Sequence, residues 1–271
     1  MDMTRWLNPS LLDGKVALVT GGGTGIGLVI ARALGQVGAQ VHLAARGTER
    51  LQEASSALAA EGIKASWSRL DVRDPEQVDR AVSDVADGYG GIDILVNNAG
   101  GQFPVKAEDL SPRGWRAVVD LNLNGTYYMT RAVGRHLIDT GRGGKILSIV
   151  LNVMERTTQG MAHSGAARAG VMHMTRTLAA EWARFGIQIN AMGPLYLSES
   201  AQQVYSDDVA RVVSDATPMH RWASDDELGM WAVWLCSPAT DYVTGVTVPV
   251  DGGNWVGGGL GWRGTSILPE D

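Results

Sequence analysis

A glycine-rich stretch, TGGGTGIG at residues 20–27, lies between an apolar, β-branched run and an apolar pattern of helical spacing. Its glycines let the main chain turn tightly and approach a ligand closely. The following helix start presents unpaired N–H groups and a positive dipole end to an anion. The pattern is typical of a turn that binds a dinucleotide pyrophosphate, although a turn without a ligand has the same local shape. The residues expected to contact the dinucleotide here are Gly21, Thr24, Gly25, Ile26 and Gly27.

The end of the second predicted strand selects between the two nicotinamide dinucleotides. An acidic residue there binds the ribose 2′-OH of NAD, whereas a basic residue favours the 2′-phosphate of NADP. The chain reads Ala44-Ala45-Arg46 at this point, without an acid. Arg46 offers a fork of N–H donors that suits a phosphate, while a solvated surface arginine is the alternative reading. The sequence therefore favours NADP over NAD, with NAD left open.

Ser164 and Arg168 stand four residues apart in a helical pattern at 160–186, so they share one helix face. An unassisted serine hydroxyl is too weak an acid to protonate a substrate oxygen. Arginine stays protonated and cannot shuttle protons, but its charge can stabilise an oxyanion. The pair therefore favours a reaction in which stabilising negative charge matters more than proton transfer. His163 is a candidate base, but a lone histidine at a helix start is more often structural.

Strand-like runs alternate with helical patterns along the whole chain. This alternation predicts right-handed βαβ units and an α/β fold: a single doubly wound, Rossmann-type parallel sheet with helices on both faces. All 271 residues fit one domain (1–271), with a core at about 14–253 and a Gly-rich C-terminal arm at 254–271. The predicted strands are 15–20, 40–45, 65–72, 92–100, 145–152, 186–194 and 246–253, and the predicted helices include 24–38, 48–61, 111–139 and 160–186.

Composition excludes several classes of function. The formal net charge of −6 and a pI near 5.4 give no basic face for nucleic acid. No apolar run has membrane-spanning length, and the first residues lack the layout of a signal peptide, so a cytoplasmic protein is expected. Cys236 is the only cysteine, so neither an intrachain disulfide nor a cysteine-based metal site is expected.

Four motifs in order along residues 14–253 resemble the short-chain dehydrogenase/reductase family: TGGGTGIG, Asp71-Val72, NNAG at 97–100 and DGG at 251–253. The resemblance implies a nicotinamide-dependent oxidoreductase that forms a homodimer or homotetramer and acts on a small molecule. It places Asp71 and Val72 beside the adenine, and Pro194 beside the nicotinamide. Leu195 departs from the glycine that the family has at this point. The floor of the cofactor site would be formed by Asn98, Ala99 and Gly100.

The family's catalytic positions are altered in this chain. By the resemblance, a tyrosine, a lysine four residues later and a serine thirteen residues before the tyrosine would carry the reaction. Here Ser164 occupies the tyrosine position, Arg168 the lysine position and Leu151 the upstream serine position. Asn122 in the LNLNG stretch is retained. The expected catalytic residues are therefore Asn122, Ser164 and Arg168. Tyr196, at the start of the predicted substrate loop at 196–220, is the best placed remaining tyrosine, although aromatic packing in the loop is the favoured interpretation.

Within the family, HSGAARAGV at 163–171, GGQF at 100–103 and LNLNGTYYMTRA at 121–132 resemble trans-2-enoyl-CoA reductases and the related 2,4-dienoyl-CoA reductases. This likeness implies NADPH-dependent reduction of a conjugated enoyl thioester, with an acyl-CoA as a candidate substrate. A dinucleotide-binding protein that has lost redox catalysis remains an alternative, as does a generic carbonyl or alcohol oxidoreductase. A lyase of the halohydrin-dehalogenase kind ranks last, because those proteins keep the tyrosine and lose the glycines.

Overall fold

A computed structural model describes residues 7–150, 159–198 and 206–257 of the chain. Three sequence predictions lie outside these ranges: the Leu151 position, part of the substrate loop and the arm beyond residue 257.

The centre of the molecule is a seven-stranded sheet in which every pairing between neighbouring described strands is parallel. The strand order is β3-β2-β1-β4-β5-β6-β7, so the chain starts in the middle, winds to one edge and then to the other. This is the predicted doubly wound topology. The strands are β1 (Val16–Thr20), β2 (Gln40–Ala45), β3 (Ala65–Arg69), β4 (Ile94–Asn97), β5 (Gly144–Ile149), β6 (Ile187–Pro194) and β7 (Thr247–Val250).

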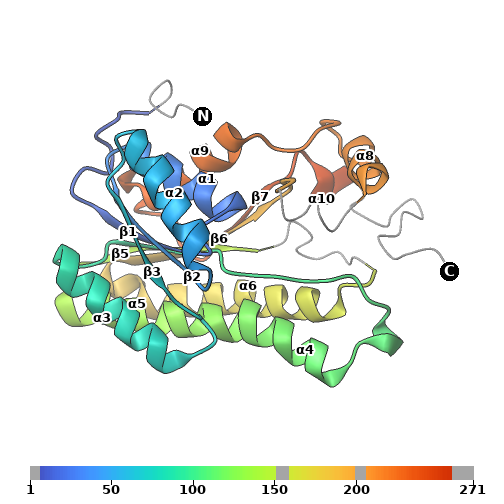
Figure 1. Cartoon of the computed structure of the whole chain (residues 1–271), viewed down its shortest axis with the longest axis horizontal. Helices are drawn as coiled ribbons and strands as arrows, with labels where there is room; N and C mark the ends of the chain where they lie inside the picture. The colour runs from blue at the N-terminus through green and yellow to red at the C-terminus, as the bar shows by residue number, and fades with distance from the viewer. Residues whose placement is uncertain (1–6, 151–158, 199–205, 258–271) are drawn as a thin grey trace.

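Helices cover both faces of the sheet (Figure 1). One apolar core packs α1 (Gly25–Gln36), α2 (Thr48–Ala60) and α9 (Asp225–Cys236) on one face. A second core packs α3 (Pro75–Tyr89), α5 (Gly125–Thr140) and α6 (Ala162–Trp182) on the other. The remaining described α-helices are α4 (Pro112–Val119), α8 (Asp207–Ala216) and α10 (Asn254–Gly257). The prediction of a parallel sheet with helices on both faces is confirmed.

Helix boundaries follow local capping chemistry. Asp74 accepts hydrogen bonds from the main chain of the first turn of α3, with Pro75 at the next position, and Gly90 ends the helix in a left-handed conformation with φ 75°. Ser224 and Glu227 form a capping box at the start of α9. The sequence patterns did not predict α9, although its capping box is a local sequence signal for the start of a helix. Similarly, α8 lies within the predicted substrate loop and begins at the capping residue Ser206.

The helix predicted at 111–139 is present but is not uniform. α4 and α5 are joined without a break by a π-helical turn, η3 (Asp120–Asn124). Such turns insert one extra residue into the helix and occur preferentially at functional sites. Asn122 lies in this turn and is completely buried. The π turn thus positions Asn122, one of the three predicted catalytic residues.

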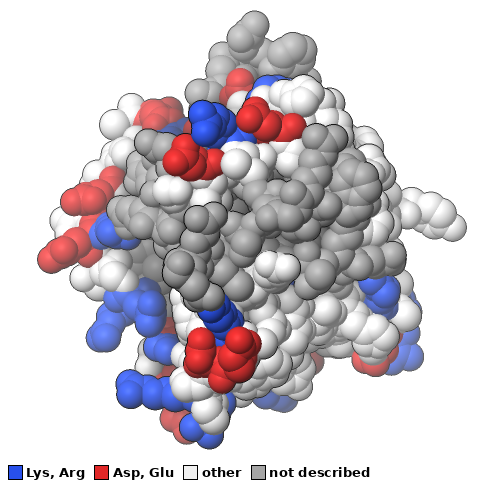
Figure 2. Space-filling model, turned by 90° about the vertical axis from the view of Figure 1, so that its right-hand side faces the viewer, with Lys and Arg blue, Asp and Glu red and all other residues white. Residues whose placement is uncertain are grey.

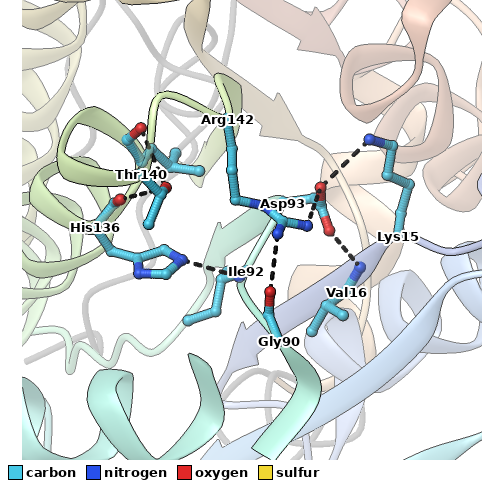
Figure 3. Close-up of polar contacts among 9 residues, drawn as sticks. Lys15, Val16, Gly90, Ile92, Asp93, His136, Thr140 and Arg142 are labelled. Carbon is cyan, nitrogen blue, oxygen red and sulfur yellow. Dashed lines mark hydrogen bonds and ion pairs between the residues drawn. The ribbon is translucent and has the colours of Figure 1, made fainter. Parts of the chain in front are cut away.

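Figure 3 shows how the amino ends of the central strands are fixed. Asp93, directly before β4, accepts a hydrogen bond from the Val16 N–H over 3.0 Å and pairs with Lys15 over 3.3 Å. It also pairs with Arg142, which precedes β5, over 3.4 Å. Arg142 in turn donates to the Gly90 carbonyl over 2.8 Å. One buried carboxylate therefore links the starts of β1, β4 and β5, and leaves the opposite, carboxyl edge for ligands.

Figure 2 views the molecule from the end at which α4 and α6 begin, which is the carboxyl edge of the sheet. On the described part of this surface, Lys and Arg side chains lie among Asp and Glu side chains. Within the described ranges, no helix combines the length and the apolar character that crossing a bilayer requires.

Candidate functional site

The glycine-rich turn between β1 and α1 is shaped by two positive backbone angles, φ 64° at Gly21 and φ 53° at Gly25. A side chain is unfavourable at either position. A Cβ atom on Gly27 would collide with the main-chain oxygen of Gly21 and with the side-chain nitrogen of Asn98. Thr24 caps α1 without a side-chain hydrogen bond to its first turn, and no acidic residue lies there. The first N–H groups of α1 therefore meet an electrostatic setting that suits an anion.

Asn98 and Ala99 hold the end of β4 against this turn. The Asn98 side chain donates to the Thr20 carbonyl over 3.0 Å and to the Gly21 carbonyl over 3.2 Å. The Thr20 hydroxyl accepts from the N–H groups of Asn98 and Ala99 over 3.0 and 3.1 Å. The predicted floor residues and the predicted phosphate turn thus form one hydrogen-bonded unit across β1 and β4.

Three arginines line one hollow of about 460 Å³ at the ends of β2 and β3. Arg46 follows β2, Arg50 lies in α2, and Arg69 ends β3, where the sheet register pairs it with Ala45. None of the three forms an ion pair with a carboxylate of the described residues. The Glu49 carboxylate also lines the hollow, but three guanidinium groups leave it with a net positive charge that suits a doubly charged phosphate monoester.

Of these arginines, the sequence prediction named only Arg46. Arg69 could have been found from parallel pairing, because the carboxyl ends of β2 and β3 lie side by side. Arg50 lies in the first turn of α2, four residues after Arg46.

Asp71 and Val72, expected beside an adenine, follow β3. The Asp71 carboxylate accepts hydrogen bonds from the Arg73 guanidinium over 2.6 and 2.9 Å. These bonds hold the pKa of Asp71 below its usual value, against an opposing effect of burial. Val72 is buried against Gly125, where an added Cβ would lie 2.7 Å from a Val72 methyl group. Asp71 therefore carries an ionised carboxylate at this edge of the sheet. Val72 anchors the loop to α5.

Pro194 ends β6, and Leu195 continues its pairing with β7. The Leu195 N–H donates to the Val250 carbonyl over 2.9 Å, and its side chain is buried. The Tyr196 hydroxyl donates to the Asp225 carboxylate over 2.6 Å, at the start of α9, and its ring packs against the α1–α9 core. This geometry favours the packing interpretation of Tyr196 over a role as proton donor.

The predicted catalytic residues Asn122, Ser164 and Arg168 meet at one short segment, Gly100–Gln102, just beyond β4. Asn122 forms two hydrogen bonds with the main chain of Gly101, each over 2.9 Å. Arg168 lies against Gly100, where an added Cβ would collide with the guanidinium group. Ser164 donates its hydroxyl proton to the side-chain oxygen of Gln102 over 2.6 Å. The fold thus brings together three residues that are spread over 47 positions of the sequence.

Arg168 carries a buried positive charge. Its Nη1 donates to the Ile149 carbonyl at the end of β5 over 2.5 Å, whereas its Nε is buried and has no hydrogen-bond partner among the described residues. Burial lowers the pKa of Arg168 to about 10, so the group is still a cation near neutral pH. A buried cation without a described carboxylate partner favours a bound oxyanion beside it.

Ser164 is fully buried, and its neighbour His163 is equally buried. The His163 Nδ1 accepts from the Ser164 N–H over 2.8 Å, and its ring stands edge-on to Phe103 at 4.7 Å between centroids. Burial lowers the pKa of His163, which favours the neutral ring. The ring therefore packs against the segment that carries Gln102. Sequence reasoning assigned no role to Gln102, although it stands two residues beyond the NNAG motif.

Comparisons with known proteins agree with this geometry. A family model described as enoyl-(acyl carrier protein) reductase matches residues 21–254. The chain is 38% identical to gluconate 5-dehydrogenase of Gluconobacter oxydans, over 89% of this chain and 95% of that protein. It is 34% identical to peroxisomal 2,4-dienoyl-CoA reductase of Arabidopsis thaliana, over 92% of this chain and 87% of that protein.

Among solved structures, gluconate 5-dehydrogenase of Burkholderia cenocepacia, in complex with NADP and tartrate, matches with a TM-score of 0.86 and 36% identity. The match covers 91% of this chain and 97% of that one. The glycine-rich turn, the parallel sheet and these matches along most of the length lead to one conclusion: the chain belongs to the short-chain dehydrogenase/reductase family of oxidoreductases.

Proposed function

We propose that this protein is an NADPH-dependent reductase of a conjugated enoyl thioester or a related conjugated carbonyl compound. NADP, when bound in its reduced form, supplies a hydride. The glycine-rich turn from Gly21 to Gly27 would hold its pyrophosphate, because the first N–H groups of α1 lie there without a side-chain cap or an acidic residue. Arg46, Arg50 and Arg69 would bind the 2′-phosphate. The NADP complex of the Burkholderia enzyme, which has the same fold, supports this assignment.

The observation that carries the substrate class is the hydrogen bond from Ser164 to Gln102. At the tyrosine position the chain has a buried serine whose proton is already donated within the protein. No tyrosine hydroxyl among the described residues is bonded to Ser164 or Arg168, and the hydroxyl of Tyr196 is bonded to Asp225. A ketone substrate would need a proton at oxygen in the product. The described site offers charge and hydrogen bonds there rather than an acid.

Reduction of a conjugated thioester does not require a proton donor at the substrate oxygen. Hydride addition at the β-carbon moves the double-bond electrons onto the thioester oxygen, and a proton from water then adds at the α-carbon. The Arg168 cation would stabilise the negative oxygen while it exists. The Arabidopsis relative, a 2,4-dienoyl-CoA reductase, supports an acyl-CoA as the substrate class.

A second candidate is oxidation of a polyol acid. The gluconate 5-dehydrogenase of Gluconobacter is 38% identical to this chain, whereas the Arabidopsis 2,4-dienoyl-CoA reductase is 34% identical. A carboxylate is also an anion that the buried Arg168 cation could attract. The missing phenol weighs against this reaction, because an alcohol must lose a proton as it is oxidised.

Turnover by the purified protein separates these candidates. We expect NADPH to be oxidised in the presence of a medium-chain trans-2-enoyl-CoA, and much more slowly with a 3-ketoacyl-CoA. Reduction of NADP⁺ by gluconate without any enoyl activity would favour the second candidate. No turnover with either substrate, despite tight dinucleotide binding, would favour a protein that has lost redox catalysis.

We also propose a homodimer or homotetramer. The aromatic side chains of Trp115 on α4 and Tyr127 on α5 are exposed to 40% and 45%, and such side chains are enriched at interfaces between subunits. Light scattering after size-exclusion chromatography tests this, and a monomeric mass would contradict it.

A further inference from the structure

A different side chain lies against each of the three residues of the segment Gly100–Gln102. Asn122 binds the main chain of Gly101 through both of its amide atoms. The guanidinium of Arg168 lies against Gly100, and Ser164 binds the side chain of Gln102. The family's catalytic positions therefore share one structural task in this chain, which is to fix the segment that carries Gln102.

Ser164 and Gln102 differ in their access to a ligand. Ser164 is completely buried, and its hydroxyl proton points to Gln102. Gln102 is only partly buried and lies at the carboxyl edge of the sheet, beyond β4. A substrate oxygen can thus approach the amide of Gln102 more readily than the hydroxyl of Ser164.

We propose that Gln102 is the neutral group that binds the substrate oxygen, and that Ser164 is a positioning residue that acts through Gln102. This inference rests on the proposed function and adds a specificity-determining residue to it. The bond from Ser164 fixes the Gln102 oxygen, which sets the direction of the amide nitrogen on the opposite side of the same plane. That nitrogen has two N–H donors, so it can keep one contact within the protein and still donate to a substrate.

The chemistry of an amide defines the substrates that it serves. An amide donates hydrogen bonds to a carbonyl or thioester oxygen but does not release its proton near neutral pH. The Gln102 amide and the Arg168 cation together form a site that stabilises an oxyanion. The proton that completes the product comes from water and adds at the α-carbon. The expected ligand is therefore an uncharged conjugated carbonyl group, and Gln102 distinguishes it from a hydrocarbon of the same shape.

Substitutions at these two positions test the inference. Gln102→Leu keeps the approximate volume and removes both the acceptor and the donors. Ser164→Ala removes only the bond that orients the amide, and Ser164→Thr restores a hydroxyl. Gln52→Leu, on an exposed position of α2, is the matched control. For each variant we would measure kcat and KM with trans-2-enoyl-CoA, NADPH affinity by fluorescence and the melting temperature.

We expect Gln102→Leu to lower kcat/KM by about one to two orders of magnitude with unchanged NADPH affinity, and to lower the melting temperature no more than Ser164→Ala does, since both variants lose the same buried hydrogen bond. Ser164→Ala should lower it less, and the double variant should be no worse than Gln102→Leu alone, because both changes remove the same contact. Ser164→Thr should recover part of the loss. Multiplicative effects in the double variant would contradict a serine that acts through Gln102.

A Gln102→Glu variant adds a readout that a structural role would not change. A protonated carboxyl group can donate to the substrate oxygen, whereas a carboxylate cannot. We therefore expect its turnover to rise as the pH falls into the carboxyl range, at about pH 4 to 5, while the wild type shows no such rise. A parallel pH profile in both proteins would overturn the proposal.

The failure of this inference differs from the failure of the proposed function. An active wild type with a fully active Gln102→Leu variant would overturn the role of Gln102 and leave the proposed function standing. A wild type without activity on any conjugated carbonyl compound would contradict the proposed function, and the substrate contact of Gln102 with it.

Discussion

Arg168 on α6 donates a hydrogen bond to the carbonyl of Ile149 at the end of β5, over 2.5 Å. This bond fixes one side of a guanidinium whose Nε has no described partner. The cation is therefore oriented by the sheet and held beside the predicted reaction site, rather than neutralised by a carboxylate of the described residues.

The first prediction concerns this charge. Arg168→Met should lower turnover by about one to two orders of magnitude, because loss of a charged hydrogen bond at such a site costs about 1.5–3 kcal/mol. Arg168→Lys should be partly active, since the charge remains but the planar fork does not. Steady-state kinetics measure both effects, with melting temperature as the check on folding. Full activity of Arg168→Met would identify the arginine as a packing residue.

The second prediction concerns the cofactor. NADPH should raise the melting temperature more than NADH at equal concentration, because the three guanidinium groups of the hollow would bind its 2′-phosphate. Arg46→Ala should remove most of this preference, and Arg50→Ala and Arg69→Ala should each weaken NADPH binding by about tenfold or more. Arg135→Ala, exposed on α5, is the control. Equal shifts with both dinucleotides would remove the case for NADP.

The third prediction concerns the glycine-rich turn. Gly27→Ala should abolish dinucleotide binding or destabilise the protein by about 1–3 kcal/mol, since the new methyl group would collide with the Gly21 carbonyl. Gly88→Ala is the matched control, because a Cβ at this helical position meets nothing within 4 Å. The control should stabilise α3 by about 0.5–1 kcal/mol. Calorimetric titration with NADPH and urea unfolding measure the two effects.

The fourth prediction concerns stability and pH. His42 is buried between the hydroxyls of Ser66 and Ser68, at 2.7 and 2.9 Å, and burial lowers its pKa to about 4. Because the unfolded chain titrates near pH 6.5, the folded state binds fewer protons. Stability from this group is therefore full above about pH 6.5 and is lost as the pH falls toward 4.

Urea unfolding at two pH values checks this effect. Between about pH 7.5 and pH 5, the wild type should lose about 2 kcal/mol through His42 alone. His42→Gln should reduce this loss, whereas His173→Gln, exposed on α6, should leave it unchanged. An identical loss in all three proteins would show that His42 does not carry the pH dependence.

Much of the fold could be predicted because its signals are local. The β-branched runs, the helical spacing and the turn glycines predicted all seven strands of the described sheet and the helices between them. Three of the described α-helices, α8, α9 and α10, were not predicted, and α10 falls in the stretch assigned to the C-terminal arm. In α9 apolar residues occupy several faces, so the amphipathic pattern is weak, and α8 was assigned to a loop on the polar composition of 196–220. Their serine caps, Ser206 and Ser224, were local signals that went unused.

The residues of the candidate site also fall into those that the sequence predicted and those that only the structure revealed. The positions of Asn122, Ser164 and Arg168 could be named from motif spacing, and the structure brings them together, but their roles remain predictions. Gln102 was not assigned a role, although it lies in the GGQF stretch, because a motif does not show which side chain it will bond to. Its partner Ser164 is 62 positions away, and only packing of α6 beside the end of β4 joins the two.

The sequence by itself determined the local features of the chain. These are the glycines that can take positive φ, the order of strands and helices, and the chemical groups at the predicted catalytic positions. Only the tertiary structure decided which groups meet. It placed Arg69 beside Arg46 through the register of β2 and β3, and it directed the Ser164 proton to Gln102. The physical reason is that backbone conformation depends on neighbours in the chain, whereas hydrogen-bond partners depend on which strand ends the parallel sheet brings to one edge.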